Sequence, residues 1–225
     1  MTSKNTLIIG TRGSALALAQ ADMVRAALSA LHPGLDIRRE IIRTTGDRRT
    51  DVPLADVARV SGIVDKGIFI KELETALLEG RIDVAVHSLK DVPSELAPEF
   101  RLPAVLPRAA AEDVLITKEP DWNGRGTLAT GSVRRRLMAR TYWGRQLRFE
   151  DLRGNVPTRL EKLVEHPEWD AVILAKAGLE RLGLYAPETV VQGRKLYMRP
   201  LPVEAFIPAV GQGIVGMESV SYTHL

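Results

Sequence analysis

Short apolar runs alternate with amphipathic stretches along the chain. The β-branched run Thr6–Gly10 predicts a strand, and the helix-like stretch Ala15–Leu31 follows it. Lys71–Leu78 has apolar residues at helical spacing, and Ile82–His87 is typical of a buried strand. The same pattern predicts further strands at Ile37–Arg43, Arg101–Leu106, Asp113–Thr117, Thr127–Thr130, Leu147–Glu150 and Ala171–Leu174, and helices starting at Val133, opened by Pro157 and near Leu179–Leu182.

This alternation of strands and helices predicts the α/β class. Such a pattern favours parallel-rich sheets with helices on both faces. The strands Arg101–Leu106 and Asp113–Thr117 would lie near a crossing between two lobes. No low-complexity segment and no repeat of solenoid period interrupts the series.

Two turns in the halves of the chain resemble each other. Thr11–Ser14 and Thr130–Ser132 each place a glycine and a serine where a predicted strand passes into a helix. Helix N-termini carry free N–H groups, so both turns are candidate anion sites, and two facing lobes would line one cleft with them. The alternative is ordinary helix capping without a ligand.

Composition limits the classes of protein that fit. The 225 residues are 45% hydrophobic and 26% charged, as in an ordinary globular protein. The apolar runs are too short to span a membrane, and the first ten residues lack a signal-peptide apolar region. With no cysteine and four scattered histidines, we expect no disulfide, no metal site and a cytoplasmic location.

The net charge of +3 is unevenly distributed. From Arg134 to Arg159 the chain has eight arginines against Glu150 and Asp151, a net charge of +6 that leaves −3 for the rest. A concentrated patch of one sign indicates an anionic partner. Guanidinium groups bind carboxylates bidentately, so a ligand with several carboxylates would fit.

Two groups of residues could carry chemistry. Lys90 and Asp91 follow a buried strand, where they form either an acid/base pair or a surface ion pair of little energetic weight. Arg134–Arg136 opens a helix, where cations oppose the helix dipole unless anions bind there. Three consecutive helical residues cannot all face one ligand, so we expect Arg136 to be solvated. A basic solvated face or a nucleic-acid surface are the alternatives.

Seven segments of the chain form a recognisable series over about residues 6–218. The segments are Thr11–Gln20, Lys66–Glu74, His87–Pro93, Gly131–Arg135, Leu152–Val156, Ala177–Leu184 and Pro208–Gly213. In this order they resemble the porphobilinogen deaminase (hydroxymethylbilane synthase) family. Each segment is weak alone, but together they are specific.

The resemblance implies a cytoplasmic transferase of tetrapyrrole biosynthesis. Such an enzyme joins four porphobilinogen units into hydroxymethylbilane with release of ammonia, and it is primed by a dipyrromethane cofactor bound to a cysteine. Its first two domains have the type II periplasmic-binding-protein fold. By this resemblance we assign residues 1–103 and 201–218 to a first lobe, 104–200 to a second, and 219–225 to a tail that does not match the family.

The resemblance also implies roles for individual residues. Asp91 matches the catalytic aspartate, which stabilises positive charge as the aminomethyl group leaves. The residues that match carboxylate-binding arginines are Arg12, Arg134, Arg135, Arg153, Arg159 and Arg181. The residues that match supporting polar contacts are Ser14, Lys66, Ser88, Lys90, Thr130 and Ser132. Arg136, Arg140, Arg145 and Arg148 match no motif position and are expected to be surface charge.

The sequence departs from the family in two places. Residues 56–66, where the family has a mobile lid, are longer than usual and lack its paired glycines. The chain also ends before the family's third domain and has no cysteine. We therefore expect a truncated form that is inactive alone, for lack of the cofactor's anchor.

The partner expected from these features is porphobilinogen, bound by a monomer without nucleic acid or membrane. A non-catalytic binder of small anionic solutes is the first alternative, because the fold alone does not fix function. A nucleic-acid binder is the second, although few aromatic residues accompany the arginines for base stacking.

Overall fold

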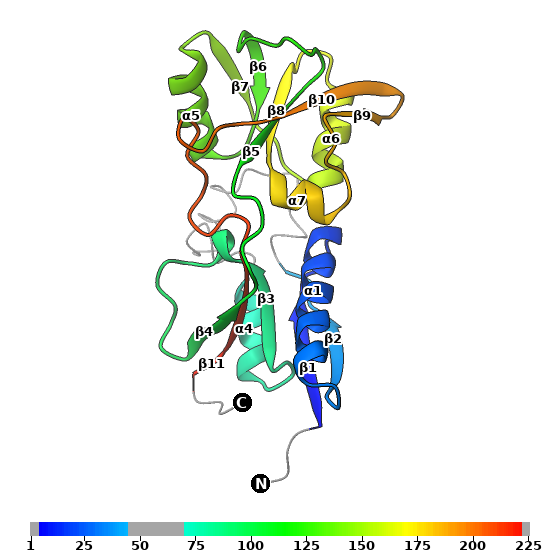
Figure 1. Ribbon diagram of the computed structural model, residues 1–225. Coiled ribbons are helices and arrows are strands. Elements are labelled where there is room, and N and C mark those ends of the chain that lie inside the picture. Colours follow the sequence, from blue (N-terminus) through cyan, green and yellow to red (C-terminus); the bar gives the residue numbers. More distant parts are fainter. Residues whose placement is uncertain (1–4, 45–69, 222–225) are drawn as a thin grey trace. The chain divides into compact units, whose positions relative to one another are not determined.

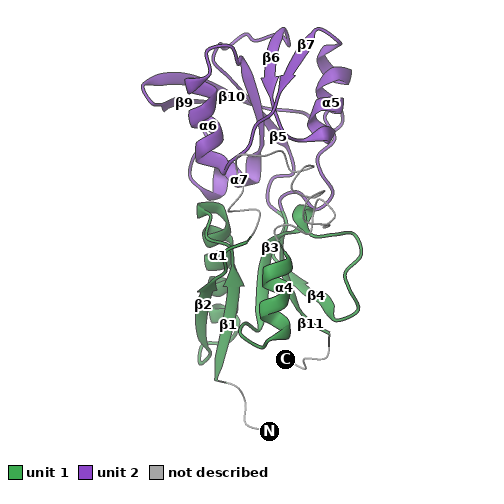
Figure 2. Ribbon diagram, turned by 180° about the vertical axis from the view of Figure 1, so that it is seen from behind, with its two compact units in different colours: residues 1–108, 214–225 green, residues 109–213 purple. Residues whose placement is uncertain are grey.

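Two units make up the computed structural model, which describes residues 5–44 and 70–221. Residues 1–108 and 214–225 form unit 1, and residues 109–213 form unit 2 (Figure 2). The chain thus leaves unit 1, completes unit 2 and returns to unit 1 for its last strand. Figure 1 shows the elements in chain order.

The sheet of unit 1 has the strand order β2-β1-β3-β11-β4. β1 pairs in parallel with β2 and β3, whereas β11 runs antiparallel to β3 and to β4. The elements of this unit are β1 (Thr6–Thr11), α1 (Ala15–Leu31), β2 (Asp36–Ile41), α4 (Lys71–Leu78), β3 (Val84–Ser88), the 3₁₀ turn η2 (Leu89–Asp91), β4 (Phe100–Val105) and β11 (Val215–Val220).

The two faces of this sheet are buried by different helices. Side chains alternate along β3, so Val84 and Val86 pack with Val24 of α1. Ala85 points the other way and packs with Leu73 and Leu77 of α4. This arrangement gives the sheet an apolar layer on each side and leaves its carboxyl-end turns to carry polar groups.

The sheet of unit 2 has the strand order β7-β6-β8-β5-β10-β9. β6 is parallel to β7 and β8, while β5, β10 and β9 join in antiparallel pairs. The elements are β5 (Asp113–Thr117), β6 (Gly126–Ala129), α5 (Val133–Trp143), β7 (Leu147–Glu150), α6 (Val156–Glu165), β8 (Ala171–Ala175), α7 (Lys176–Arg181), β9 (Glu188–Val191) and β10 (Arg194–Pro200).

Helices again cover both faces. Leu160 and Leu163 of α6 pack against Val172 of β8 in one apolar cluster. Ala139 of α5 packs with Ile173 in the other, on the opposite face of the same strand. The prediction of two α/β lobes is confirmed, and both sheets prove to be mixed. Each has three parallel strands on one side, β2-β1-β3 or β7-β6-β8, and antiparallel pairs on the other.

The unit boundaries differ from the predicted ones, which fell after residue 103 and after residue 200. β4 continues to Val105 in the sheet of unit 1. Residues 201–213 belong to unit 2 because Leu201 and Phe206 are buried in its core. Ser219 and Val220, which we assigned to the tail, lie in β11 opposite Arg101 and Phe100, and residues 222–225 lie outside the described part.

Candidate functional site

A pocket in unit 1 lies where β1 and β3 end. These parallel neighbours bring their carboxyl ends to the same edge of the sheet, where the turn before α1 meets η2. The polar residues that line the pocket are Arg12, Ser14, Gln20, His87, Ser88 and Asp91. Four of them are site residues expected from the sequence, and Lys90 is half-buried in the same 3₁₀ turn.

Two polar residues shape this pocket from α1. Ser14 is the N-cap of α1, and its Oγ accepts a hydrogen bond from Ala17 N at 3.3 Å. Gln20, on the next turn, lies with Nε2 2.8 Å from Ser88 Oγ. No sequence pattern singles out Gln20, since its partner lies 68 positions away.

The charges of the pocket suit a ligand that carries both signs. Arg12 offers a guanidinium and Asp91 a carboxylate to the same space. Asp91 ends η2, whose start is held by a hydrogen bond from Leu89 N to Ile214 O at 3.0 Å. A small molecule with an ammonium group and a carboxylate would find a partner for each.

His87, which lines this pocket, belongs to a buried ionisable pair. His87 Nε2 lies 2.8 Å from Glu218 Oε2, and their side chains are 4% and 0% exposed. The other oxygen, Glu218 Oε1, is buried without a hydrogen-bond partner. The pair links β3 to β11 and was not predicted.

The second candidate anion site is the N-terminus of α5 in unit 2. Ser132 caps this helix, its Oγ accepting from Arg135 N at 3.3 Å, and Thr130 Oγ1 accepts from Ser132 N at 3.2 Å. A Cβ on Gly131 would lie 3.0 Å from Leu152 O and 3.9 Å from Arg153 Cδ. A side chain at this position would force Leu152 O to shift by a few tenths of an ångström, so glycine favours the close approach of this turn to the Leu152–Arg153 segment. This approach brings Arg153 beside the helix N-terminus.

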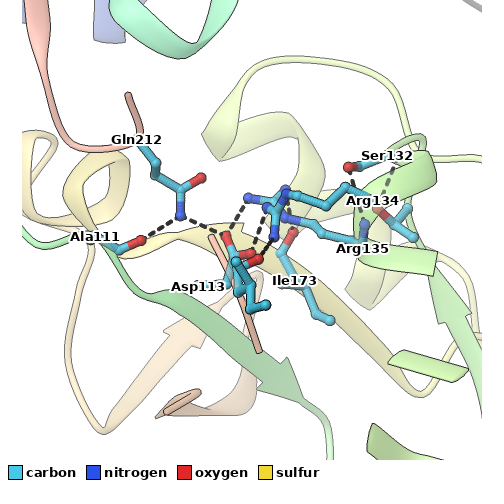
Figure 3. Close-up of polar contacts among 9 residues, drawn as sticks. Ala111, Asp113, Ser132, Arg134, Arg135, Ile173 and Gln212 are labelled. Atoms are coloured by element: carbon cyan, nitrogen blue, oxygen red, sulfur yellow. Dashed lines mark hydrogen bonds and ion pairs between the residues drawn. The ribbon is translucent and has the colours of Figure 1, made fainter. Parts of the chain in front are cut away.

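Arg134 and Arg135 share a buried carboxylate (Figure 3). Nη2 of Arg134 and Nη2 of Arg135 each donate to Asp113, at 2.7 Å, one to each carboxylate oxygen. Asp113 is fully buried, and this burial would raise its pKa. The charges and hydrogen bonds of Arg135 and Arg134 outweigh burial, so the pKa lies below its usual value and the carboxylate stays ionised.

Arg136 does not match the expectation of a merely solvated cation. Its Nε donates to Thr130 O at 3.0 Å, and its Nη2 pairs with Asp151. Its guanidinium lies 6.0 Å from the centre of the Phe149 ring, and that of Arg140 lies 5.1 Å from it. Arg145 and Arg148 are exposed, as expected.

Arg159 and Arg181 bind backbone carbonyls of unit 2. Arg159 Nε donates to Gly154 O at 2.7 Å, just before α6, whose N-cap is Asn155. Arg181 Nη2 donates to Gly213 O at 2.7 Å. Burial lowers the pKa of Arg181, with Glu180 opposing, although a guanidinium remains charged at neutral pH.

Some expectations fall outside what the structure describes. Lys66 and the segment 56–66 are among the residues not described.

Among the described residues, histidine, aspartate and glutamate form no group of three that could bind a metal ion. No helix in residues 5–44 and 70–221 combines the length and apolarity needed to cross a membrane.

Comparison with known proteins gives consistent matches over almost the whole chain. A family model described as "Porphobilinogen deaminase, dipyromethane cofactor binding domain" matches residues 7–224. The chain is 43% identical over 221 residues to the porphobilinogen deaminase of Roseiflexus castenholzii, covering 96% of this chain and 67% of that one. The enzyme of Syntrophobacter fumaroxidans is 42% identical, with 93% and 64% covered. The chain thus spans about two thirds of these relatives' length.

Similarity to solved structures concerns the fold alone. The BenM effector-binding domain, solved with its effector benzoate, gives a TM-score of 0.53 at 14% identity, with 98% of this chain and 85% of that one covered. A putative LysR family regulator from Pseudomonas aeruginosa gives 0.54 at 13% identity, with 98% and 66% covered.

Proposed function

Because the chain belongs to the porphobilinogen deaminase family, the transferases of tetrapyrrole biosynthesis, we propose that its two units bind the pyrroles of that reaction. In the reaction, four porphobilinogen units are joined head to tail, and each addition releases ammonia. The observation that carries the proposal is the pocket of unit 1, which combines Asp91 with Arg12 at the ends of β1 and β3. Porphobilinogen has an aminomethyl group and two carboxylates, and the pocket offers a partner for each sign of charge.

Asp91 is the proposed catalytic residue. Loss of ammonia leaves an electron-poor pyrrole, and a fixed carboxylate nearby stabilises the developing positive charge. The short 3₁₀ turn and its hydrogen bond to Ile214 O fix the backbone that carries Asp91. A preorganised anion needs no rearrangement during the reaction, which is the main source of such stabilisation.

The carboxylate groups are proposed to bind at the helix N-termini. Ser14 and Ser132 each satisfy one N–H of the first turn, and the partial positive charge of the helix end remains for an anion. Arg12 in unit 1, and Arg134 and Arg153 in unit 2, add full charges beside these turns. The roles of Lys66, Lys90, Arg159 and Arg181 in binding stay predictions from the resemblance.

Dipyrromethane is a chain of two pyrroles with four carboxylates, and each unit by itself has an arginine beside a helix N-terminus that would suit such carboxylates, Arg12 in unit 1 and Arg134 in unit 2. When bound, this cofactor supplies the pyrrole to which the first substrate is joined. Within these 225 residues no cysteine is present to form the thioether. We therefore expect that this polypeptide, incubated with porphobilinogen, shows no covalent mass increment by intact-mass spectrometry and forms no bilane; a pyrrole-sized increment with bilane formation would overturn this.

We also propose that the protein acts as a cytoplasmic monomer without nucleic acid. The absence of cysteine from these 225 residues supports a reducing compartment. The arginines Arg134–Arg136 of α5 are engaged with Asp113, Thr130 and Asp151 within the protein, which argues against a basic surface for nucleic acid. Light scattering with and without duplex DNA tests both points. A dimer, or salt-dependent DNA binding, would contradict them.

Calorimetric titration with porphobilinogen tests the proposed function. We expect saturable binding that Arg12→Gln weakens by about 10- to 100-fold, since a hydrogen bond to a charged group contributes roughly 1.5–3 kcal/mol. Arg39→Gln is the matched control, because Arg39 lies in the same unit but pairs with Asp22 on the surface. Absence of saturable binding, or equal losses in both variants, would contradict the proposal.

A further inference from the structure

Asp113 connects three segments of unit 2 that are distant in sequence. Its side chain accepts hydrogen bonds from Arg134 and Arg135 of α5 and, at 3.0 Å, from Gln212 Nε2 (Figure 3). Gln212 Nε2 also donates to Ala111 O at 2.7 Å, and Leu201 N donates to Asp113 O at 2.8 Å. The first residue of β5 thus fixes both α5 and the 201–213 segment.

The two arginines differ in exposure although they are neighbours in sequence. The side chain of Arg135 is 7% exposed, its Nη1 donates to Ile173 O at 2.8 Å, and its Nε is buried without a partner. The side chain of Arg134 is 27% exposed, and its Nη1 donates to Ile207 O at 2.6 Å. The bonds of Arg134 to Ile207 O and to Asp113 use two of its five N–H donors.

The charges in this network do not cancel. One carboxylate and two guanidinium groups leave a net charge of +1 at the N-terminus of α5, next to the capping residue Ser132. A buried charge without a counter-ion is very unfavourable, so Asp113 must first compensate the more buried arginine. The uncompensated charge is therefore carried by Arg134, on the exposed side.

We infer that the two arginines have different roles: Arg134 contacts a ligand carboxylate, whereas Arg135 compensates the buried charge of Asp113. Asp113 is the positioning residue that holds Arg134 and the 201–213 segment in place. This inference rests on the proposed function and revises one expectation from the resemblance, in which Arg134 and Arg135 both bind carboxylates. It also assigns a role to Asp113, which the sequence did not single out.

The test combines porphobilinogen titration with urea unfolding on the same variants. Arg134→Gln should weaken binding at least about tenfold with a small change of the urea midpoint. Arg135→Gln should lower the urea midpoint strongly, while its folded fraction binds within about threefold of the unchanged chain. Arg145→Gln, an exposed arginine beyond the end of α5, is the control for nonspecific loss of charge.

A double-mutant cycle separates positioning from general stabilisation, and it decides the matter even if Arg135→Gln does not fold. Asp113→Asn should weaken binding on its own but add nothing to Arg134→Gln, because Asp113 acts on the ligand through Arg134. Additive losses, or an equal loss of binding in folded Arg135→Gln and Arg134→Gln, would overturn the inference. Failure of the unchanged chain to bind porphobilinogen would instead contradict the proposed function.

Discussion

His87 and Glu218 form an ionisable pair inside unit 1, with Nε2 and Oε2 2.8 Å apart. They lie on adjacent antiparallel strands, since Gly216 pairs with His87 and Glu218 with Ala85. The charges of this pair act on the pKa of Glu74 in α4. Burial raises the pKa of Glu74, the charge of Glu218 raises it further, and His87 opposes both.

Glu218→Gln should therefore lower the pKa of Glu74 toward its ordinary value of 4.5 without restoring it, because burial remains. Titration of the Glu74 carboxyl carbon by NMR measures this directly. Glu95→Gln, which removes an exposed acid from the same unit, should leave that pKa unchanged. A Glu74 pKa that ignores the loss of Glu218 would contradict the coupling.

Glu74→Gln should increase the stability of unit 1 at neutral pH. The folded carboxyl binds its proton more tightly than the unfolded one, so stability falls as pH rises from 4.5 through the raised pKa and stays low above it. Removing the charge removes this loss. We therefore expect Glu74→Gln to have a higher Tm than the unchanged chain at pH 7, as measured by thermal unfolding. The gain should disappear below pH 4.5, where the Glu74 carboxyl becomes protonated in the folded and the unfolded chain alike.

Asp113 gives the opposite pH dependence. Its pKa in the folded protein is depressed below the ordinary value of 3.8, so its contribution to stability is complete above 3.8 and is lost as pH falls through the folded pKa. Urea unfolding of the unchanged chain and of Asp113→Asn, as a function of pH, measures this contribution as their difference. The difference should be largest at neutral pH and shrink below 3.8, and a constant difference would contradict the assignment.

Local features of the fold and site follow from the sequence. Ser14 and Ser132 were expected as helix caps, and both accept the expected N–H from the first turn. The strand-to-turn segment ending in Asp91 was expected at a sheet edge and lies in the unit 1 pocket. For the two caps the determining interactions lie within a few residues, so spacing alone carries the information.

Long-range partners could not be predicted in the same way. Asp113 and Gln212 are 99 positions apart, and His87 and Glu218 are 131 apart, so only the sheet topology brings them together.

The β9–β10 hairpin was missed for a different reason. Its turn uses Gln192 and Gly193, both with positive φ, where asparagine or aspartate before glycine is the usual signal.

The cap at α5 predicts a graded response to substitution. Ser132→Ala should lower the free energy of unfolding by about 1 kcal/mol, since the Arg135 N–H loses its partner in the first turn. Ser132→Gly is the matched comparison and should cost only a few tenths of a kcal/mol, because glycine leaves the helix end open to water. Urea unfolding measures both, and equal losses would show that the hydroxyl does not act as a cap.

Gly213 closes the 201–213 segment against the start of unit 2, and its geometry leaves no room for a side chain. Its φ is +87°, and a Cβ would lie 2.6 Å from Ala109 O and 2.8 Å from Ala110 O, both backbone atoms. Its own carbonyl accepts hydrogen bonds from Ala109 N at 3.0 Å and from Arg181 Nη2 at 2.7 Å. Any shift of this residue would therefore disturb an expected site residue as well.

Gly213→Ala should lower the free energy of unfolding by about 2–5 kcal/mol, combining the left-handed backbone with a steric clash. Gly183→Ala is the control, because Gly183 has a φ of +66° but no neighbouring atom within 4 Å of the position that a Cβ would take, so only the backbone cost of about 1–2 kcal/mol applies. Urea unfolding of the two variants separates strain from clash. If both lose the same stability, the close approach of Gly213 to Ala109 does not constrain the chain.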